Sequence, residues 1–283
     1  MRDPLAVTRR IHAERLLLVA WPRAILLQMA HPLVAAGVAD HSTFRRDWRA
    51  PIVRLQRTVA AMLAITYGDD DARARAIGRI RAIHERVHGE LPEANGAHAA
   101  GATYSAEDPA LLLWVHATLL DSMVVFYERL VGPLSAADRD AYCDENAAGA
   151  LELGADPATV PRTWPALQRY LTDEYASGRI VVGPQARELG RRVLTPQFGW
   201  VIWPVTTAIR TLTVALLPPS IRDEYGFAWR PRDERVASRL ASLLHRVRRV
   251  TPQSIVWWRG YRDLLHPRAT RQPHPDIAPR AQS

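Results

Sequence analysis

The chain has 283 residues, of which 48% are hydrophobic and 23% charged, so one large domain or two small ones can bury a substantial core. Its single cysteine, Cys143, excludes an intramolecular disulfide and a cysteine-based metal cluster, and cytoplasmic residence is the default for such a chain. The formal charge is +8, and all 37 basic residues are arginine. Acidic residues are interspersed with these arginines, as in "DDDARARAIGRIRAIHERVHGE", so we expect a solvated helix surface and no nucleic-acid partner.

Two helical segments are predicted after residue 21. Residues 22–38 predict a helix that begins at Pro22 and is broken or kinked at Pro32, because proline lacks the amide that a helix interior needs. Residues 51–68 begin with proline and end with glycine, which is the asymmetry expected of a single helix.

Two more helices are predicted before residue 133. Residues 69–89 have acids in the first turn and Gly89 as the expected C-terminal stop. Residues 105–132 have Ser105 as the expected cap and Gly132 as the stop. The middle of this segment is apolar nearly all round, which indicates a central helix buried on most sides.

The second half of the chain continues as capped amphipathic helices, the last of them strongly basic. The segment RIVVG, residues 179–183, is the one strand candidate, because alternating patterns are otherwise nearly absent. The predicted class is therefore all-α. The further helical segments are residues 135–154, 163–178, 183–194 and 232–250.

No linker is long or polar enough to divide the chain, so we expect a single-domain helical bundle over residues 22–266. Residues 1–21 are expected to form an N-terminal extension. Residues 267–283 are rich in proline and arginine and are expected to form a loose tail.

The most membrane-like stretch is residues 199–219. Pro204 and Arg210 lie inside it, and a charged residue at mid-span is costly in a bilayer. We therefore expect a buried helix or an interfacial contact here, with peripheral membrane association as the corresponding partner, and not a membrane span.

Residues 84–88 read His-Glu-Arg-Val-His. This H-E-x-x-H spacing places two imidazoles one turn apart on a helix face and can hold zinc for hydrolysis. Arg86 would oppose the charge of the metal, and the glycine directly after His88 would place that histidine at a fraying helix end. A zinc hydrolase that uses His84, Glu85 and His88 is therefore kept as an alternative hypothesis.

Four motifs occur in order at helical spacings: PRAILLQMAHPLVAAGVADHSTF, RLQRT, IHERVHG and YSAEDPALLLWVHATLLDS. Together they resemble the family of the latex-clearing proteins and the MpaB oxygenase, over about residues 22–266. The resemblance implies an all-α fold with a globin-like core that holds a b-type haem. It also implies an enzyme that uses O₂ to cleave carbon–carbon double bonds of isoprenoid chains to carbonyl products.

The resemblance assigns roles to individual residues. His84 falls where the family has its proximal haem-iron ligand, so it is the expected metal ligand. Arg54 and Thr58 fall on the arginine and threonine of the haem-pocket helix, and His88 stands where latex-clearing members have an arginine. Arg57 replaces a lysine that closes the distal side of the iron in such members, and a guanidinium is a very poor ligand. Arg54 and Arg57 are three residues apart on a helix, so both can face the haem propionates.

Other histidines enter the predicted site. His116 is expected to be a satisfied core residue, a residue of the haem pocket or a sixth iron ligand. His41 or Asp40 would act as a base or steer O₂ if their segment crosses the distal side. The alternative is that His31 caps the kink at Pro32 and that Asp40 caps a helix.

Residues and resemblance together predict a haem b-dependent oxygenase acting with O₂ on an apolar, unsaturated small molecule, either isoprenoid-like or aromatic. No G-x-G-x-x-G pattern follows a strand, which argues against a nicotinamide or flavin domain. A non-catalytic haem-binding module is the second alternative. The predicted catalytic residues are His41, Arg57 and Thr58. The predicted cofactor-binding residues are His84, Arg54, Arg57, Thr58, His88 and His116.

Overall fold

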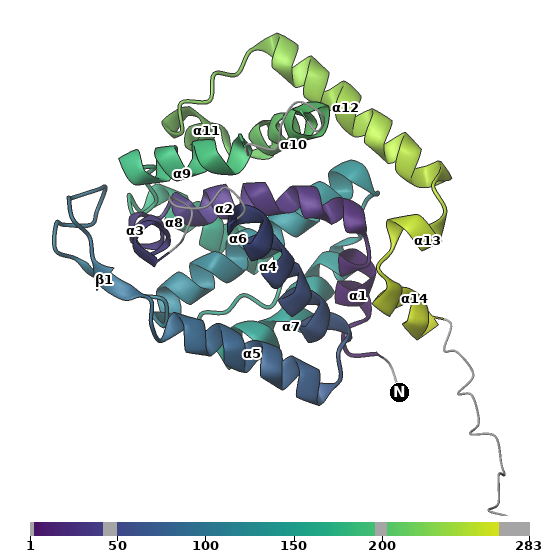
Figure 1. Cartoon of the computed structure of the whole chain (residues 1–283), viewed down its shortest axis with the longest axis horizontal. Helices are drawn as coiled ribbons and strands as arrows, with labels where there is room; N and C mark the ends of the chain where they lie inside the picture. The colour runs from purple at the N-terminus through teal and green to yellow at the C-terminus, as the bar shows by residue number, and fades with distance from the viewer. Residues whose placement is uncertain (1–2, 42–49, 196–202, 266–283) are drawn as a thin grey trace, which may run out of the picture.

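The computed structural model describes residues 3–41, 50–195 and 203–265, with the backbone alone for residues 50–55 and 264–265. Helices make up almost all of the regular structure in these ranges, which confirms the all-α class (Figure 1). The first half contains α1 (Ala6–His12), the 3₁₀ helix η1 (Arg15–Ala20), α2 (Trp21–Met29), α3 (Pro32–His41), α4 (Ala50–Tyr67), α5 (Asp70–His84), β1 (His88–Glu90), β2 (Thr103–Ser105) and α6 (Pro109–Leu130). The second half contains α7 (Ala136–Leu153), α8 (Trp164–Ala176), α9 (Pro184–Leu194), α10 (Trp203–Leu216), α11 (Pro219–Glu224), α12 (Pro231–Val250), α13 (Gln253–Val256) and α14 (Arg259–Leu265).

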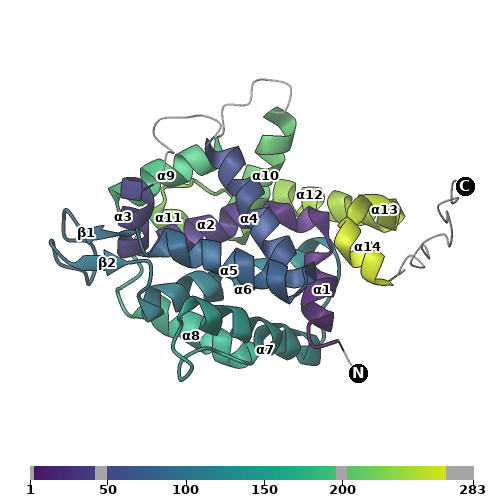
Figure 2. The ribbon, with the colours of Figure 1, turned by 60° about the horizontal axis from the view of Figure 1, so that its bottom comes forward.

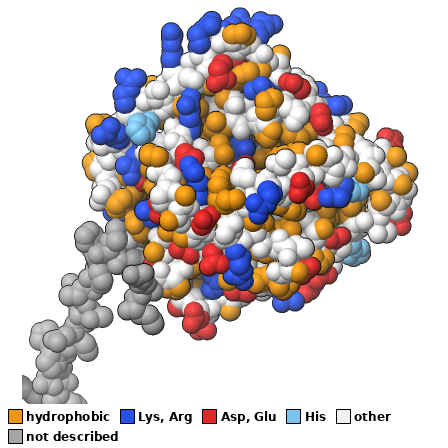
Figure 3. All heavy atoms as spheres, turned by 180° about the vertical axis from the view of Figure 1, so that it is seen from behind, with side chains coloured by type: hydrophobic (Ala, Val, Ile, Leu, Met, Phe, Trp, Pro, Cys, Tyr) orange, Lys and Arg blue, Asp and Glu red, His pale blue; other side chains and the backbone are white. Residues whose placement is uncertain are grey.

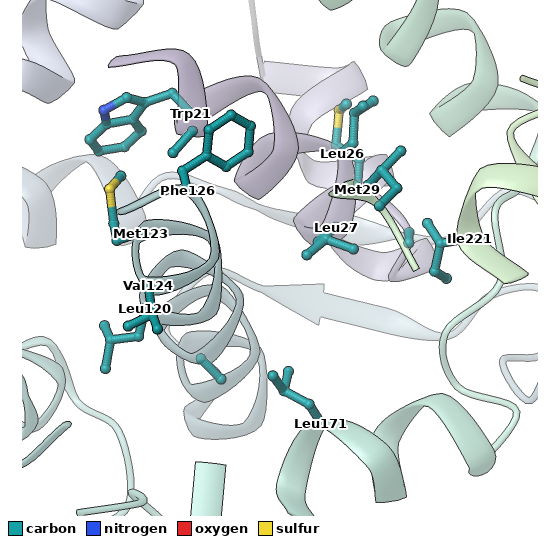
Figure 4. Packing of buried hydrophobic residues seen from close by; sticks show 14 of the residues in the cluster. Trp21, Leu26, Leu27, Met29, Leu120, Met123, Val124, Phe126, Leu171 and Ile221 are labelled. Atoms are coloured by element: carbon teal, nitrogen blue, oxygen red, sulfur yellow. The ribbon is translucent and has the colours of Figure 1, made fainter. Parts of the chain in front are cut away.

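Helix α6 is the central element of the core. It follows Asp108, whose carboxylate accepts a hydrogen bond from the amide of Ala110 at 2.8 Å. The predicted cap at Ser105 is wrong, because Ser105 lies in β2. Each large apolar side chain that α6 fully buries contributes about 1.5–3 kcal/mol to folding. Figure 4 shows the core between α6 and α2, formed by Leu120, Met123, Val124 and Phe126 of α6 and by Trp21, Leu26, Leu27 and Met29 of α2. Leu171 of α8 extends this core beside α6, and Ile221 of α11 extends it beside Leu27 and Met29.

The chain turns sharply between α2 and α3, as the sequence predicts. The segment Arg15–Met29 and helix α3 meet at 110°, and α3 begins with Pro32. His31 is buried, and its Nδ1 atom accepts a hydrogen bond from the amide of Leu33 at 3.3 Å. The interpretation of His31 as a cap of the Pro32 kink is therefore confirmed.

A buried ion pair joins α2 to α6. A terminal nitrogen of Arg23 lies 2.8 Å from a carboxylate oxygen of Asp121, and Arg23 is 4% exposed. The same guanidinium donates to the hydroxyl of Ser122 at 2.8 Å and to the carbonyl of Leu216 in α10 at 2.7 Å. Gln168 of α8 donates to Asp121 at 3.0 Å. Both charges are thus hydrogen-bonded on several sides, which a charge removed from water requires.

A second buried carboxylate ties the start of the chain to its last helices. Glu14 is 3% exposed and accepts hydrogen bonds from Arg248 of α12 and, at 2.8 Å, from the indole of Trp257. Ile11 of α1 and Leu17 of η1 are buried in the main core.

The division of the chain into an extension, a domain and a tail stays a prediction, and residues 267–283 lie outside the described ranges.

Two local predictions are wrong. Residues 179–183 form no strand; the amide of Val181 makes one hydrogen bond to the carbonyl of Ala30, at 2.9 Å, before α9 begins. The short antiparallel pair is instead β1 with β2, where Gly89 lies opposite Tyr104. Gly89 is therefore not the stop of α5, which ends at His84 and leaves residues 85–87 as a turn.

Helix α6 is long and apolar enough to cross a membrane, but 67% of its most apolar window is buried inside the protein, as in the core helix of a globular domain. The broken pair formed by Arg15–Met29 and α3 passes the same test of length and composition. Helix α10 occupies the membrane-like stretch predicted from residues 199–219. It buries Leu212, Thr213 and Val214 but leaves Trp203 66% exposed.

We predict that Arg23→Met lowers the free energy of unfolding by about 3–5 kcal/mol, because it leaves the buried charge of Asp121 unpaired. Urea denaturation followed by circular dichroism measures the change. Arg162→Met, which breaks an exposed ion pair with Asp144, is the matched control and should cost less than about 1 kcal/mol. Equal losses of unfolding free energy in the two variants would show that the buried ion pair contributes no more to stability than the exposed one.

Candidate functional site: the α4–α5 hairpin and its neighbours

Helices α4 and α5 form a hairpin with a connection of two residues, Gly68 and Asp69, and the two helices diverge from that connection (Figure 2). The carboxylate of Asp69 caps α5 by accepting a hydrogen bond from the amide of Ala72 at 2.7 Å. Helix α5, which ends at His84, thus follows directly on α4, which carries residues 54–58, the residues that the resemblance assigns to a cofactor. That His84 and residues 54–58 form one site stays a prediction.

His84 occupies the last turn of α5 and is half-buried. Its Nδ1 atom is buried and has no hydrogen-bond partner among the described residues. Burial lowers the pKa of the imidazole from its ordinary value, although the carboxylate of Glu107 acts in the opposite direction. The ring is therefore neutral at pH 7, which is the form that binds a metal ion.

The described side chains of α4, residues 56–67, are covered unevenly. Arg57 is exposed and Thr58 is half-buried, while the side chain of Arg54 lies outside the described part of the structure. Thr66 is the one buried side chain among residues 56–67, although Met62 packs against the main core. Much of the apolar surface of α4 is thus half-covered by the described protein.

His116 lies on α6 and also has a buried ring nitrogen, Nε2, without a hydrogen-bond partner in the described residues. Burial lowers the pKa of His116 to about 4. It is therefore not a satisfied core histidine. No hydrogen bond, ion pair or ring contact joins it to His84 within the described ranges, so the structure does not bring the two imidazoles together through a direct contact.

His41 and His88 lie together on the β1–β2 side of the molecule. The Nε2 atom of His41 is 3.0 Å from the carbonyl oxygen of His88, and both side chains are exposed. The ring of His41 stands edge-on to Tyr104, whose hydroxyl donates to a carboxylate oxygen of Asp40 at 2.7 Å. The carboxylate of Asp40 therefore holds Tyr104 in place. It does not cap a helix, as one of the sequence interpretations expected.

The structure does not have the geometry that the zinc hypothesis requires. His84 ends α5 and His88 begins β1, so the two imidazoles do not lie one turn apart on one helix. The described residues also contain no group of three His, Cys, Asp or Glu side chains that could hold a metal ion.

Two residues near these positions were not predicted. Tyr104 packs so closely that a Cβ atom at Gly89 would come within 2.6 Å of its hydroxyl oxygen. The imidazole of His98 lies 4.9 Å, centroid to centroid, from that of His31, whose pKa burial lowers to about 3. Both contacts join residues far apart in the chain, so no local sequence pattern indicates them.

Comparison with known proteins then gives the class of protein. Residues 8–249 match the family described as "ER-bound oxygenase mpaB/B'/Rubber oxygenase, catalytic domain". Uncharacterized protein Mb2261 of Mycobacterium bovis and uncharacterized protein Rv2237 of Mycobacterium tuberculosis are each 26% identical over 236 residues, which is 81% of this chain and 87% of each relative. No solved structure matches. Because the match covers most of the chain, the protein belongs to this oxygenase family, and the resemblance found in the sequence is confirmed.

We predict that lowering the pH from 8 to 5 costs about 2 kcal/mol of unfolding free energy through His116 alone. The pKa of His116 is lower in the folded than in the unfolded chain, so the unfolded chain takes up the proton first as pH falls below 6.5. His116→Gln should remove this part of the pH dependence. Urea denaturation at the two pH values measures it, and an unchanged difference in the variant would contradict the burial of a neutral ring.

Proposed function

We propose that the protein is a haem b-dependent oxygenase that uses O₂ to cleave a carbon–carbon double bond of an apolar small molecule. Membership of the family supports the oxygenase class. The observation that carries the haem part of the proposal is the imidazole of His84, which is neutral, half-buried and unpartnered at Nδ1. A buried ring nitrogen without a hydrogen bond costs free energy unless another group satisfies it.

The residues of the hairpin fit a porphyrin better than a bare metal ion. Haem iron needs one protein imidazole, whereas a zinc site draws three or four protein ligands. His84 supplies that imidazole, and the half-buried Val59 and Leu63 of α4 supply apolar surface for a flat ring. Arg57 supplies an exposed cation for the carboxylates that such a ring carries.

Bound haem would supply the binding of O₂ and the redox chemistry. The chain's own residues would hold and orient the reactants: His84 as the iron ligand, Arg54 and Arg57 as cations for the propionates, and Thr58 as a hydroxyl donor. In the reaction as written, both atoms of one O₂ molecule end in the two carbonyl products of one alkene, so no external electron donor is consumed. The substrate is proposed to be apolar, because the surface of α4 that stays half-covered is apolar.

We predict that His84→Ala abolishes retention of haem, because it removes the single iron ligand. The visible spectrum of the purified protein, oxidised and reduced, measures haem through its intense Soret band. His245→Ala is the matched control, since His245 is also a half-buried histidine but lies on α12 and has no predicted role at the haem, and it should retain haem. A wild-type protein that stays colourless and iron-free after haem is added would contradict the proposal.

We predict that Thr58→Val and Arg57→Gln each lower turnover about tenfold to a hundredfold, the effect of losing one hydrogen bond to a charged group. Oxygen uptake with an apolar alkene substrate measures turnover per bound haem, with one O₂ consumed per double bond cleaved. Arg75→Gln, on an exposed position of α5, is the control and should leave turnover unchanged. A haem-loaded protein that consumes no oxygen with any such alkene would support a non-catalytic haem-binding module instead.

A further inference from the structure

The exposed large hydrophobic side chains of the described residues are concentrated in the last third of the chain. On the face in Figure 3, hydrophobic side chains gather near the middle and arginine side chains stand out along the upper edge, so the surface is not evenly mixed. Seven of the eight large exposed hydrophobics of the described ranges belong to α10, α12 and α13. Those seven are Trp203, Val205, Val236, Leu243, Val247, Val250 and Ile255.

Helix α12 carries four of these side chains in one stripe. Val236, Leu243, Val247 and Val250 are 54%, 54%, 49% and 82% exposed. Their spacings of seven, four and three residues place them on one face of the helix. We call these four residues the α12 stripe. Helix α12 packs on the protein through Ala237 and Ala241, which lie on one flank of the stripe, so the stripe is not the face that packs.

Four exposed arginines run beside the stripe: Arg235, Arg239, Arg246 and Arg249. With about 100° per residue, they lie on the flank of the stripe that points away from the packed side. We call them the arginine row. Residues 235–250 contain no acidic residue, so no carboxylate stands among the arginines of the row, and the acids of α12 lie in its first turn.

The remaining arginine in the second half of α12, Arg248, does not belong to the row. Arg248 points to the protein side, where it donates to the buried carboxylate of Glu14. This contact and the packing of Ala237 and Ala241 fix the rotation of α12 about its axis. The stripe and the row are therefore presented outward together, at the outer edge of the molecule (Figure 1).

We propose that this face of α12 binds an anionic membrane surface, with the α12 stripe at the boundary of the acyl chains and the arginine row on the lipid phosphates. A helix that combines an apolar face with arginines is suited to such an interface. The inference is independent of the proposed function and uses different residues from the membrane-like stretch of the sequence.

The alternatives fit less well. A nucleic acid would use the arginine row but gives no reason for four exposed aliphatic side chains beside it. In a symmetric dimer the stripes of the two copies would cover each other, but residues 235–250 supply no carboxylate that could pair with the arginine row of the other copy. An anionic bilayer offers acyl chains to the α12 stripe and phosphates to the arginine row.

The test is flotation of the full chain with vesicles of phosphatidylcholine alone and of equal parts phosphatidylcholine and phosphatidylglycerol. We expect binding to the anionic vesicles, weaker binding to the neutral ones, and loss of binding as salt is raised. Each arginine near an anionic surface strengthens binding about fivefold, so the triple variant Arg239→Gln, Arg246→Gln, Arg249→Gln should bind about a hundredfold more weakly. Leu243→Ser with Val247→Ser should also weaken binding while leaving the arginine row intact.

The matched control replaces three exposed arginines of α5, Arg75, Arg79 and Arg81, with glutamine. It removes the same charge and should bind as the wild type does. Circular dichroism and light scattering show whether each variant is folded and monomeric. The proposal is overturned by any of three results: no binding of the folded wild type to anionic vesicles, an equal loss in the α5 control, or a dimer that the serine variant dissociates. Binding of a labelled DNA duplex through the arginine row without vesicle binding would overturn it as well.

Discussion

The pairing of Arg23 with Asp121 constrains the whole bundle. Its two charges lie where water does not reach, so each must be hydrogen-bonded, and the partners come from α2, α6, α8 and α10. These four helices are consequently fixed in one mutual arrangement, because a shift of any one would leave a charge unsatisfied. The apolar contacts of α6 give the core most of its stabilisation, and the ion pair specifies how the helices are arranged around it.

The candidate site is built differently from this core. Helices α4 and α5 have few buried side chains in the described ranges, and their position depends on the short connection between them and on contacts at their ends. The features that suit His84 to a cofactor, a neutral ring and an unpartnered nitrogen, come from partial burial at the end of α5. The core is therefore tightly packed and the hairpin is less covered. Regions that bind ligands are commonly the less stable parts of a fold.

Local patterns in the sequence were enough to predict most helices, because prolines, glycines and first-turn acids mark ends within a few residues. The end of α5 and the β1–β2 pair could not be predicted in this way. Gly89 looks like a helix stop, but its lack of a side chain serves the close approach of Tyr104, fifteen residues further on. The unpartnered nitrogens of His84 and His116 depend on packing that no single segment encodes. The alternative zinc hypothesis required one continuous helix across residues 84–88, but these residues comprise the end of α5, a turn and the start of β1.

The contact between Glu14 and Arg248 has a consequence for how the protein is made. The two residues are separated by 234 positions, and the indole of Trp257, which shares the carboxylate, comes later still. While the chain is leaving the ribosome, the first helices can collapse on one another, but the acid among them has no cation to meet until nearly the whole polypeptide has emerged. Synthesis and the final closure of the fold are thereby coupled, and a nascent chain halted before residue 248 would keep its first segment from settling into place.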